Sequence, residues 1–193
     1  MRSRVFSTLF TVGTLVAITA CSVTTTTTDP GGTSPTGSSE TPAEPSDPEL
    51  AGIVAAHNEV RAAVSPAPAS PLGKLAWSEE DAAVARAYAE KCVFSHNKDR
   101  GTRGENLYAS SGSSSAAEVV KSWASEVSDY DYATNKCSGV CGHYTQVVWG
   151  ATTHLGCAKK TCTTNSPFGN KGSWEIWVCN YSPPGNFVGK KPY

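Results

Sequence analysis

Six of the seven cysteines in this chain of 193 residues lie within residues 92–179, and they constrain its fold more than any other feature. An even number of cysteines in a short exported domain indicates a disulfide framework, and six cysteines allow fifteen connectivities. The competing interpretation is a zinc site, because two cysteine pairs have spacings that metal ligands also adopt. An export signal favours disulfides over thiolate ligands. The six positions are Cys92, Cys137, Cys141, Cys157, Cys162 and Cys179.

The first twenty residues supply that export signal. Arg2 and Arg4 give a small positive region, and residues 5–20 are mostly apolar or carry hydroxyl groups. Such a run is near the lower limit for a membrane span, and its threonines and serine weaken it further. We therefore interpret residues 1–20 as a signal peptide, which predicts an extracytoplasmic protein that is secreted or anchored to the cell envelope.

The seventh cysteine, Cys21, follows this segment directly. The run Ile18-Thr19-Ala20-Cys21 resembles the lipobox of bacterial lipoproteins, in which cleavage leaves the cysteine as the first residue and lipid is attached to it. The alternative is an ordinary secretory signal whose small residues precede a cysteine. Lipidation at Cys21 would anchor the protein to a membrane, because two or more acyl chains bind stably. It would also account for the odd cysteine.

Residues 21–48 are rich in Thr, Ser, Pro and Gly and contain no aromatic side chain. This composition buries too little apolar surface to offset the entropy of ordering, so it predicts a disordered linker. Residues 49–193 have the size of a single domain. They contain 14 Lys and Arg against 13 Asp and Glu, a net charge of 14 − 13 = +1. This balance provides no basic face of the size that nucleic acid requires.

Hydrophobic periodicity predicts helices early in the domain and strands late in it. Residues 49–64 and 116–130 carry apolar side chains at helical spacing, and Ser78 is placed to cap a helix that continues through Cys92. Helices followed by strands indicate an α+β fold rather than a parallel βαβ sheet. The predicted strands are residues 155–163 and 174–181.

Five short motifs follow one another along the domain and give it a recognisable pattern. They are SHN at residues 95–97, GENLY at 104–108, GHYTQVVW at 142–149, LGCA at 155–158 and CNYSPPGN at 179–186. In this order, and with six cysteines, they resemble the signatures of the CAP superfamily. This family comprises cysteine-rich secretory proteins, insect-venom antigens and plant pathogenesis-related proteins, and the ending PPGNFVGKKPY is most similar to the plant branch.

The resemblance implies a fold and a disulfide pairing. The implied fold is a three-layer α-β-α sandwich around an antiparallel sheet, stabilised by disulfides. The pairing carried over from the family joins Cys92 to Cys162, Cys137 to Cys141 and Cys157 to Cys179.

The resemblance also implies a cavity with two histidines and two glutamates. The matching positions are His96, Glu105, Glu126 and His143. Two neutral imidazoles at His96 and His143 suit Zn²⁺ or another divalent metal, with the glutamates orienting the rings. The alternative is a buried polar network that needs no metal. His57 and His154 are weaker candidates. A histidine on a helix, as His57 is predicted to be, is more often packed or exposed than functional, and His154 is predicted to lie in a turn before Leu155.

Three classes of function follow from the resemblance. The first is a module that binds a sterol, a fatty acid or another lipid in a hydrophobic groove beside the tetrad. The second is an envelope or host-interaction protein without a small ligand. The third is a metal-dependent hydrolase, which we favour least because no activated nucleophile and no catalytic residue can be identified.

The C-terminal residues 183–193 fit a further pattern. In plant relatives a tail of this form is proposed to be released as a signalling peptide. The alternative, which we favour, is that Pro-Pro-Gly-Asn makes the final turn and the tail packs on the sheet.

Overall fold

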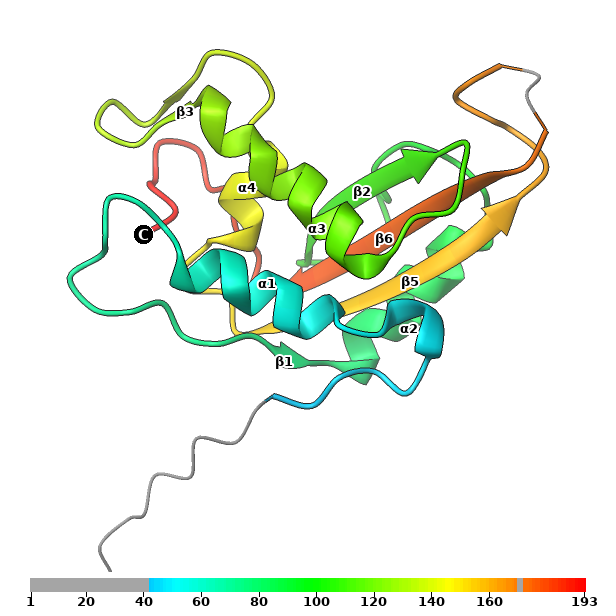
Figure 1. Ribbon diagram of the computed structural model, residues 1–193, viewed down its shortest axis with the longest axis horizontal. Helices are drawn as coiled ribbons and strands as arrows, with labels where there is room; N and C mark the ends of the chain where they lie inside the picture. The colour runs from blue at the N-terminus through cyan, green and yellow to red at the C-terminus, as the bar shows by residue number, and fades with distance from the viewer. Residues whose placement is uncertain (1–41, 170–171) are drawn as a thin grey trace, which may run out of the picture. The chain divides into compact units, whose positions relative to one another are not determined.

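A four-stranded sheet forms the middle of the domain in the computed structural model (Figure 1). Its strands lie in the order β1-β5-β6-β2. Strand β1 pairs with β5 in parallel, and the β5–β6 and β6–β2 pairs are antiparallel. The strands are β1 (Ala76–Trp77), β2 (Gly104–Ser110), β5 (His154–Cys162) and β6 (Trp174–Ser182), and a separate hairpin pairs β3 (Tyr130–Asp131) with β4 (Lys136–Cys137).

Helices cover both faces of this sheet. Three of them, α1, α3 and α4, pack on one face, and α2 packs on the opposite face, where Figure 1 shows it behind β5. The predicted three-layer α-β-α sandwich is confirmed. The helices are α1 (Ile53–Ala62), α2 (Glu79–Ala89), α3 (Ala116–Ser125) and α4 (Gly142–Val147), with short 3₁₀ turns η1 (Pro48–Leu50) and η2 (Glu126–Asp129).

Strand β6 contributes to the hydrophobic core on both faces of the sheet, because successive side chains of a strand point to opposite sides. Trp177, Cys179 and Tyr181 pack with α1, α3 and α4, whereas Ile176 and Val178 pack with α2. All five side chains are fully buried. Strand β6 is thus the common wall of two apolar layers.

The structure describes residues 42–169 and 172–193. The predicted signal peptide (residues 1–20), Cys21 and residues 22–41 of the predicted linker lie outside this part. Residues 42–48, also assigned to the linker, lie within it. No helix in the described ranges is long and apolar enough to cross a membrane.

Side-chain caps explain where the helices begin. Ser78 Oγ accepts a hydrogen bond from Asp81 N at 3.1 Å, as the sequence predicts for the start of α2. Helix α1 follows Gly52 and has no such local cap. Its first free N–H groups are instead bound by Glu44, whose two carboxylate oxygens accept from Val54 N at 3.0 Å and from Ala55 N at 2.6 Å. The end of the predicted linker is therefore joined to the domain.

The helical boundaries differ from those predicted. Residues 49–64, predicted as one helix, form η1 and then α1, because Gly52 between them has a φ of +81°. Residues 116–130, also predicted as one helix, leave the α-helical conformation after Ser125 and continue as η2. The two predicted strands agree with β5 and β6 to within one residue. Periodicity does not reveal α4, which has only six residues, or β2, whose buried run lacks alternation.

Three disulfides lie in the described part of the chain, and two of them join segments that are far apart in the sequence. The bridge between Cys157 and Cys179 joins residues directly opposite each other on β5 and β6. The other two connect Cys92 with Cys162 and Cys137 with Cys141, so the structure has the pairing that the family resemblance implies. Helix α2 ends at Ala89 and does not continue through Cys92 as predicted, and Cys92 has a φ of +51°.

Gly156 allows α2 to approach the backbone of β5 closely. A Cβ added at this position would overlap Ala82 N and Ser78 O in the first turn of α2. These are backbone atoms, which cannot rotate away as a flexible side chain could. The contact therefore fixes the distance between the α2 layer and the sheet.

We predict that Gly156→Ala lowers the free energy of unfolding by about 3 kcal/mol, because overpacking against backbone forces α2 away from the sheet. Urea denaturation of the wild type and the variant measures this difference. Gly112→Ala is the matched control, since an added Cβ there meets no atom within 4 Å. Equal losses in the two variants would contradict the argument.

Candidate functional site

His96 and Glu105 form the first hydrogen-bonded pair of the predicted tetrad. His96 lies in the loop after α2, and its Nδ1 is 2.8 Å from Glu105 Oε1 on β2. The same carboxylate oxygen accepts a hydrogen bond from Asn97 N at 2.9 Å. The Glu105 side chain is fully buried, whereas that of His96 is 59% exposed. Because the carboxylate accepts, Nδ1 carries the proton and the exposed ring keeps Nε2 as a lone-pair donor.

The other oxygen of this carboxylate is unusual. Glu105 Oε2 is buried and has no hydrogen-bond partner among the described residues. Asn180 lies directly opposite Glu105 in the β2–β6 pairing, and its Oδ1 also has no partner in the described part of the chain. Buried acceptors without donors are costly, and they are commonly satisfied by an ordered water or an ion.

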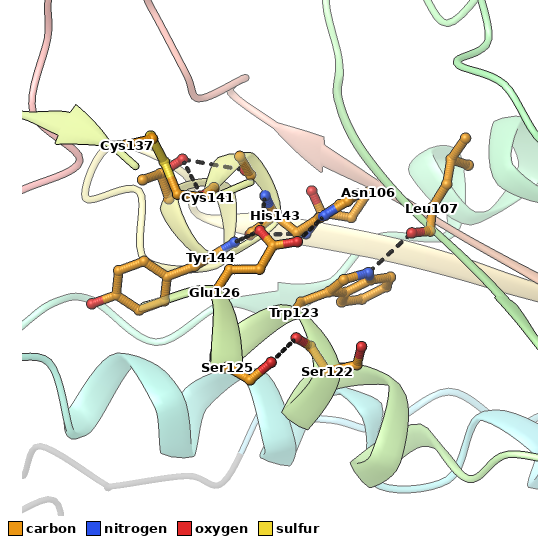
Figure 2. Close-up of polar contacts among 12 residues, drawn as sticks. Asn106, Leu107, Ser122, Trp123, Ser125, Glu126, Cys137, Cys141, His143 and Tyr144 are labelled. Atoms are coloured by element: carbon orange, nitrogen blue, oxygen red, sulfur yellow. Dashed lines mark hydrogen bonds and ion pairs between the residues drawn. A yellow bond between two sulfur atoms is a disulfide. The ribbon is translucent and has the colours of Figure 1, made fainter. Parts of the chain in front are cut away.

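His143 and Glu126 form the second pair, shown in Figure 2. Glu126 Oε1 is 2.6 Å from His143 Nδ1, and its Oε2 accepts from His143 N at 2.9 Å and from Tyr144 N at 3.3 Å. Helix α4 has no cap from its own N-cap residue, Cys141, so the Glu126 carboxylate serves as the cap. The ring of Trp123 stacks on that of His143, with centroids 6.2 Å apart.

Strand β2 connects the two pairs. Asn106, the neighbour of Glu105, donates from its Nδ2 to His143 O at 3.1 Å (Figure 2). The structure thus places each predicted histidine against one predicted glutamate and links the pairs through two adjacent residues of one strand. No local spacing in the sequence relates His96 to His143, so only the resemblance groups them.

The two remaining histidines lie apart from these pairs. His57 is completely buried in α1, where its Nδ1 donates to Ile53 O at 2.7 Å and its Nε2 accepts from Tyr181 O–H at 2.8 Å. Burial lowers the pKa of His57 to about 4, since a charged ring in the core would lose its hydration. His154 is exposed at the start of β5, and its Nδ1 contacts Thr153 Oγ1.

The candidate metal ligands of this site are the imidazoles of His96 and His143. Within residues 42–169 and 172–193, no group of three or more His, Cys, Asp or Glu side chains is arranged to hold a metal ion. The donor chemistry nevertheless fits a divalent ion, because each imidazole is held by a carboxylate at Nδ1 and presents Nε2. The unpartnered Glu105 Oε2 adds a buried anionic oxygen next to the first pair.

The C-terminal residues 183–193 pack against α4 and the β3–β4 hairpin. Gln146 Oε1 accepts from Gly185 N at 2.9 Å, and Thr145 Oγ1 donates to Asn186 Oδ1 at 2.8 Å. Near the end of the tail, the ring of Tyr193 stacks on that of Tyr132 with centroids 4.7 Å apart. The tail is thus held at several points, although by α4 and the hairpin rather than by the sheet.

Sequence reasoning missed three residues that contact His143 or bind a residue that does. They are Trp123, Asn106 and Tyr181, each of which is at most 2% exposed. Asn106 and Tyr181 belong to the motifs GENLY and CNYSPPGN, so their place in these two motifs is the signal that the sequence offers.

Comparison with known proteins identifies relatives over most of the domain. The model of the cysteine-rich secretory protein (CAP) family matches residues 54–181. Peptidase inhibitor 16 of Mus musculus is 45% identical over 144 residues, which are 73% of this chain and 28% of that protein. Pathogenesis-related protein 1 of Arabidopsis thaliana is 45% identical over 141 residues, which are 71% of this chain and 78% of that protein. The chain therefore spans about three tenths of the length of the peptidase inhibitor 16 relatives.

Solved structures are also similar to this chain over about three quarters of its length. The venom allergen-like protein 4 of Schistosoma mansoni superposes with a TM-score of 0.60 at 28% identity, covering 76% of this chain and 94% of that one. The crystal structure of NaASP2 with Zn²⁺ gives a TM-score of 0.58 at 26% identity, covering 75% of this chain and 84% of that one.

We predict that His57 makes the protein less stable in acid. Its pKa is near 6.5 when unfolded and about 4 when folded, so only the unfolded state takes up the proton between these values. The stability that the neutral ring provides is complete above pH 6.5 and is lost as the pH falls to 4, by about 3 kcal/mol. Urea denaturation across this range measures the slope.

The matched variant for this measurement is His57→Gln, which keeps hydrogen-bonding capacity and cannot take up a proton. Carboxylates titrate in both proteins, so the quantity of interest is the difference between the two slopes. Parallel stability curves from pH 6.5 to 4 would contradict the prediction.

Proposed function

Because the chain belongs to the cysteine-rich secretory protein (CAP) family, we propose that it is an exported binding domain with a divalent metal ion at its histidine–glutamate tetrad. Its disulfides agree with an oxidising, extracytoplasmic location. We also propose that lipid on Cys21 attaches it to the cell envelope. Binding, rather than catalysis, is the function that the geometry supports best.

One observation carries the metal proposal. Both His96 and His143 are fixed through Nδ1 by a carboxylate, at 2.8 and 2.6 Å, which leaves Nε2 of each ring for a ligand. Such carboxylate–histidine pairs are the usual surroundings of zinc-binding imidazoles, because the carboxylate sets the tautomer and increases ligand basicity. Water would complete the coordination, so we expect weak, exchangeable binding. The similar protein NaASP2 was crystallised with Zn²⁺, which supports this choice of ion.

We predict that Zn²⁺ binds the wild type and does not bind a His96→Ala, His143→Ala double variant, since both protein ligands are then absent. Isothermal titration calorimetry measures the heat in each case. His154→Ala is the matched control, because His154 is exposed and lies outside both pairs. Identical heats in the wild type and the double variant would remove the metal proposal.

A small apolar ligand is the second proposed function, and a groove along α1 favours it. A hollow of about 350 Å³ lies between the C-terminal half of α1 and the loop that follows it, and a second of about 250 Å³ adjoins it. The two share Asn58, Ala62 and Lys74. The larger is lined mainly by apolar side chains, namely Ala62, Val64, Ala67, Pro68, Pro71 and Leu72.

The position of this groove differs from the one expected from the sequence, which is beside the tetrad. None of the four tetrad residues lines either hollow, so the groove does not lie beside the tetrad. Apolar walls and this volume suit one fatty acid chain or part of a sterol. Lys74, which lines both hollows, would pair with a fatty acid carboxylate. This charge favours a fatty acid over a sterol.

We predict that Leu72→Asp weakens binding of a labelled fatty acid by about tenfold, because a carboxylate in the apolar wall is desolvated and repels the headgroup. Equilibrium binding of fluorescent or tritiated palmitate measures this. Val188→Asp is the matched control, since Val188 is fully exposed on the tail. Equal affinity in the wild type and Leu72→Asp would argue against this groove.

The other two functions are outcomes of these experiments. A protein that binds neither zinc nor lipid would support the envelope or host-interaction role. The metal-dependent hydrolase would gain support from zinc-dependent turnover that is lost in Glu105→Gln, because a bound ion would supply a Lewis acid and an activated water.

A further inference from the structure

A buried hydrogen-bond chain connects the second histidine of the site to helix α1, and its direction is fixed at the α1 end. His57 Nδ1 is 2.7 Å from Ile53 O, which as a carbonyl oxygen only accepts, so Nδ1 carries the proton. The ring is neutral because it is completely buried. Its Nε2 is therefore an acceptor, and Tyr181 O–H donates to it at 2.8 Å.

The direction of the remaining hydrogen bonds, those of Tyr181 and Asn106, follows from that of His57. With its own hydrogen used, Tyr181 accepts a hydrogen bond at its hydroxyl oxygen from Asn106 Nδ2 at 3.2 Å. The same Nδ2 group donates to His143 O at 3.1 Å. An amide oxygen in this place would face two acceptors, so the orientation of Asn106 follows from that of His57. Asn106, Tyr181 and His57 are each at most 1% exposed, so water does not compete.

These contacts complete the support of His143. Glu126 binds its Nδ1 and its backbone N, Trp123 stacks on its ring, and Asn106 binds its backbone oxygen (Figure 2). Glu126 acts from η2 and Asn106 from β2, so two different elements hold one residue.

We propose that Asn106, Tyr181 and His57 form a positioning relay that holds His143 in the orientation in which it binds a metal ion. The relay acts through the backbone of His143, and none of its three side chains takes part in coordination. The proposal rests on the proposed function for its metal readout, since His143 is there a metal ligand. It gives the buried histidine of α1 a role at the site, although His57 touches neither tetrad pair through a hydrogen bond.

The test compares Tyr181→Phe with Tyr108→Phe in the full chain. Both changes remove one hydroxyl from a tyrosine of the sheet, but among the described residues the Tyr108 hydroxyl bonds only to Ser114 Oγ. Competition with a zinc chelator measures the affinity for Zn²⁺. We expect Tyr181→Phe to bind Zn²⁺ about tenfold more weakly, because loss of a group that orients a metal ligand commonly lowers metal affinity by this much. We expect Tyr108→Phe to bind Zn²⁺ as the wild type does.

A second readout needs no metal. The ¹⁵N chemical shifts of the His143 ring report whether it stays in the single Nδ1–H tautomer that Glu126 requires. We expect one tautomer in the wild type and in Tyr108→Phe, and a mixture in Tyr181→Phe. If zinc affinity and ring tautomer are unchanged in Tyr181→Phe while its melting temperature falls, the relay is only structural and the proposal is overturned.

Two further outcomes are separable. If the wild type does not bind Zn²⁺, the proposed metal function fails, and the tautomer of His143 alone decides whether the relay exists. If Tyr181→Phe does not fold, Asn106→Ala replaces it, because it removes the donor to His143 O from the other end of the chain. An unchanged tautomer and affinity in Asn106→Ala would equally overturn the relay.

Discussion

Burial of β6 on both faces is the constraint on which the rest of the structure depends. Its alternating side chains supply apolar surface to α1, α3 and α4 on one side and to α2 on the other, so neither helical layer packs without it. It also pairs with β2, which carries Glu105 and Asn106, and with β5. A disulfide between Cys157 and Cys179 joins β5 to β6 covalently. The site is therefore placed by a strand that contributes no residue to the tetrad.

The two carboxylates of the predicted tetrad are part of the fold as well as of the candidate site. Glu126 caps α4 through two backbone N–H groups, and Glu105 accepts the N–H of Asn97. Each also orients an imidazole. Because one group serves both purposes, a metal site and a satisfied polar network are compatible states of the same residues. A change at either glutamate alters local structure and ring orientation together.

Sequence alone predicts much of the fold, because apolar alternation and caps are local signals. These signals predict the β5 and β6 strands and the Ser78 cap, and the family motifs imply the layers and the tetrad. The sequence does not predict α4, which is held by Glu126 from another element, or the break at Gly52. Likewise, Tyr181 and His57 are 124 residues apart, and only tertiary packing brings them into contact.

The contact of Glu44 with the start of α1 has a mechanical consequence. Val54 and Ala55, to which it binds, follow Ile53, whose carbonyl oxygen accepts a hydrogen bond from His57 Nδ1. Glu44 precedes every helix and strand of the described chain, so its contact with α1 is the first one that a force along the described residues would load. A force applied at residue 42 would therefore reach the start of α1, where Ile53 binds His57, before it reaches any strand.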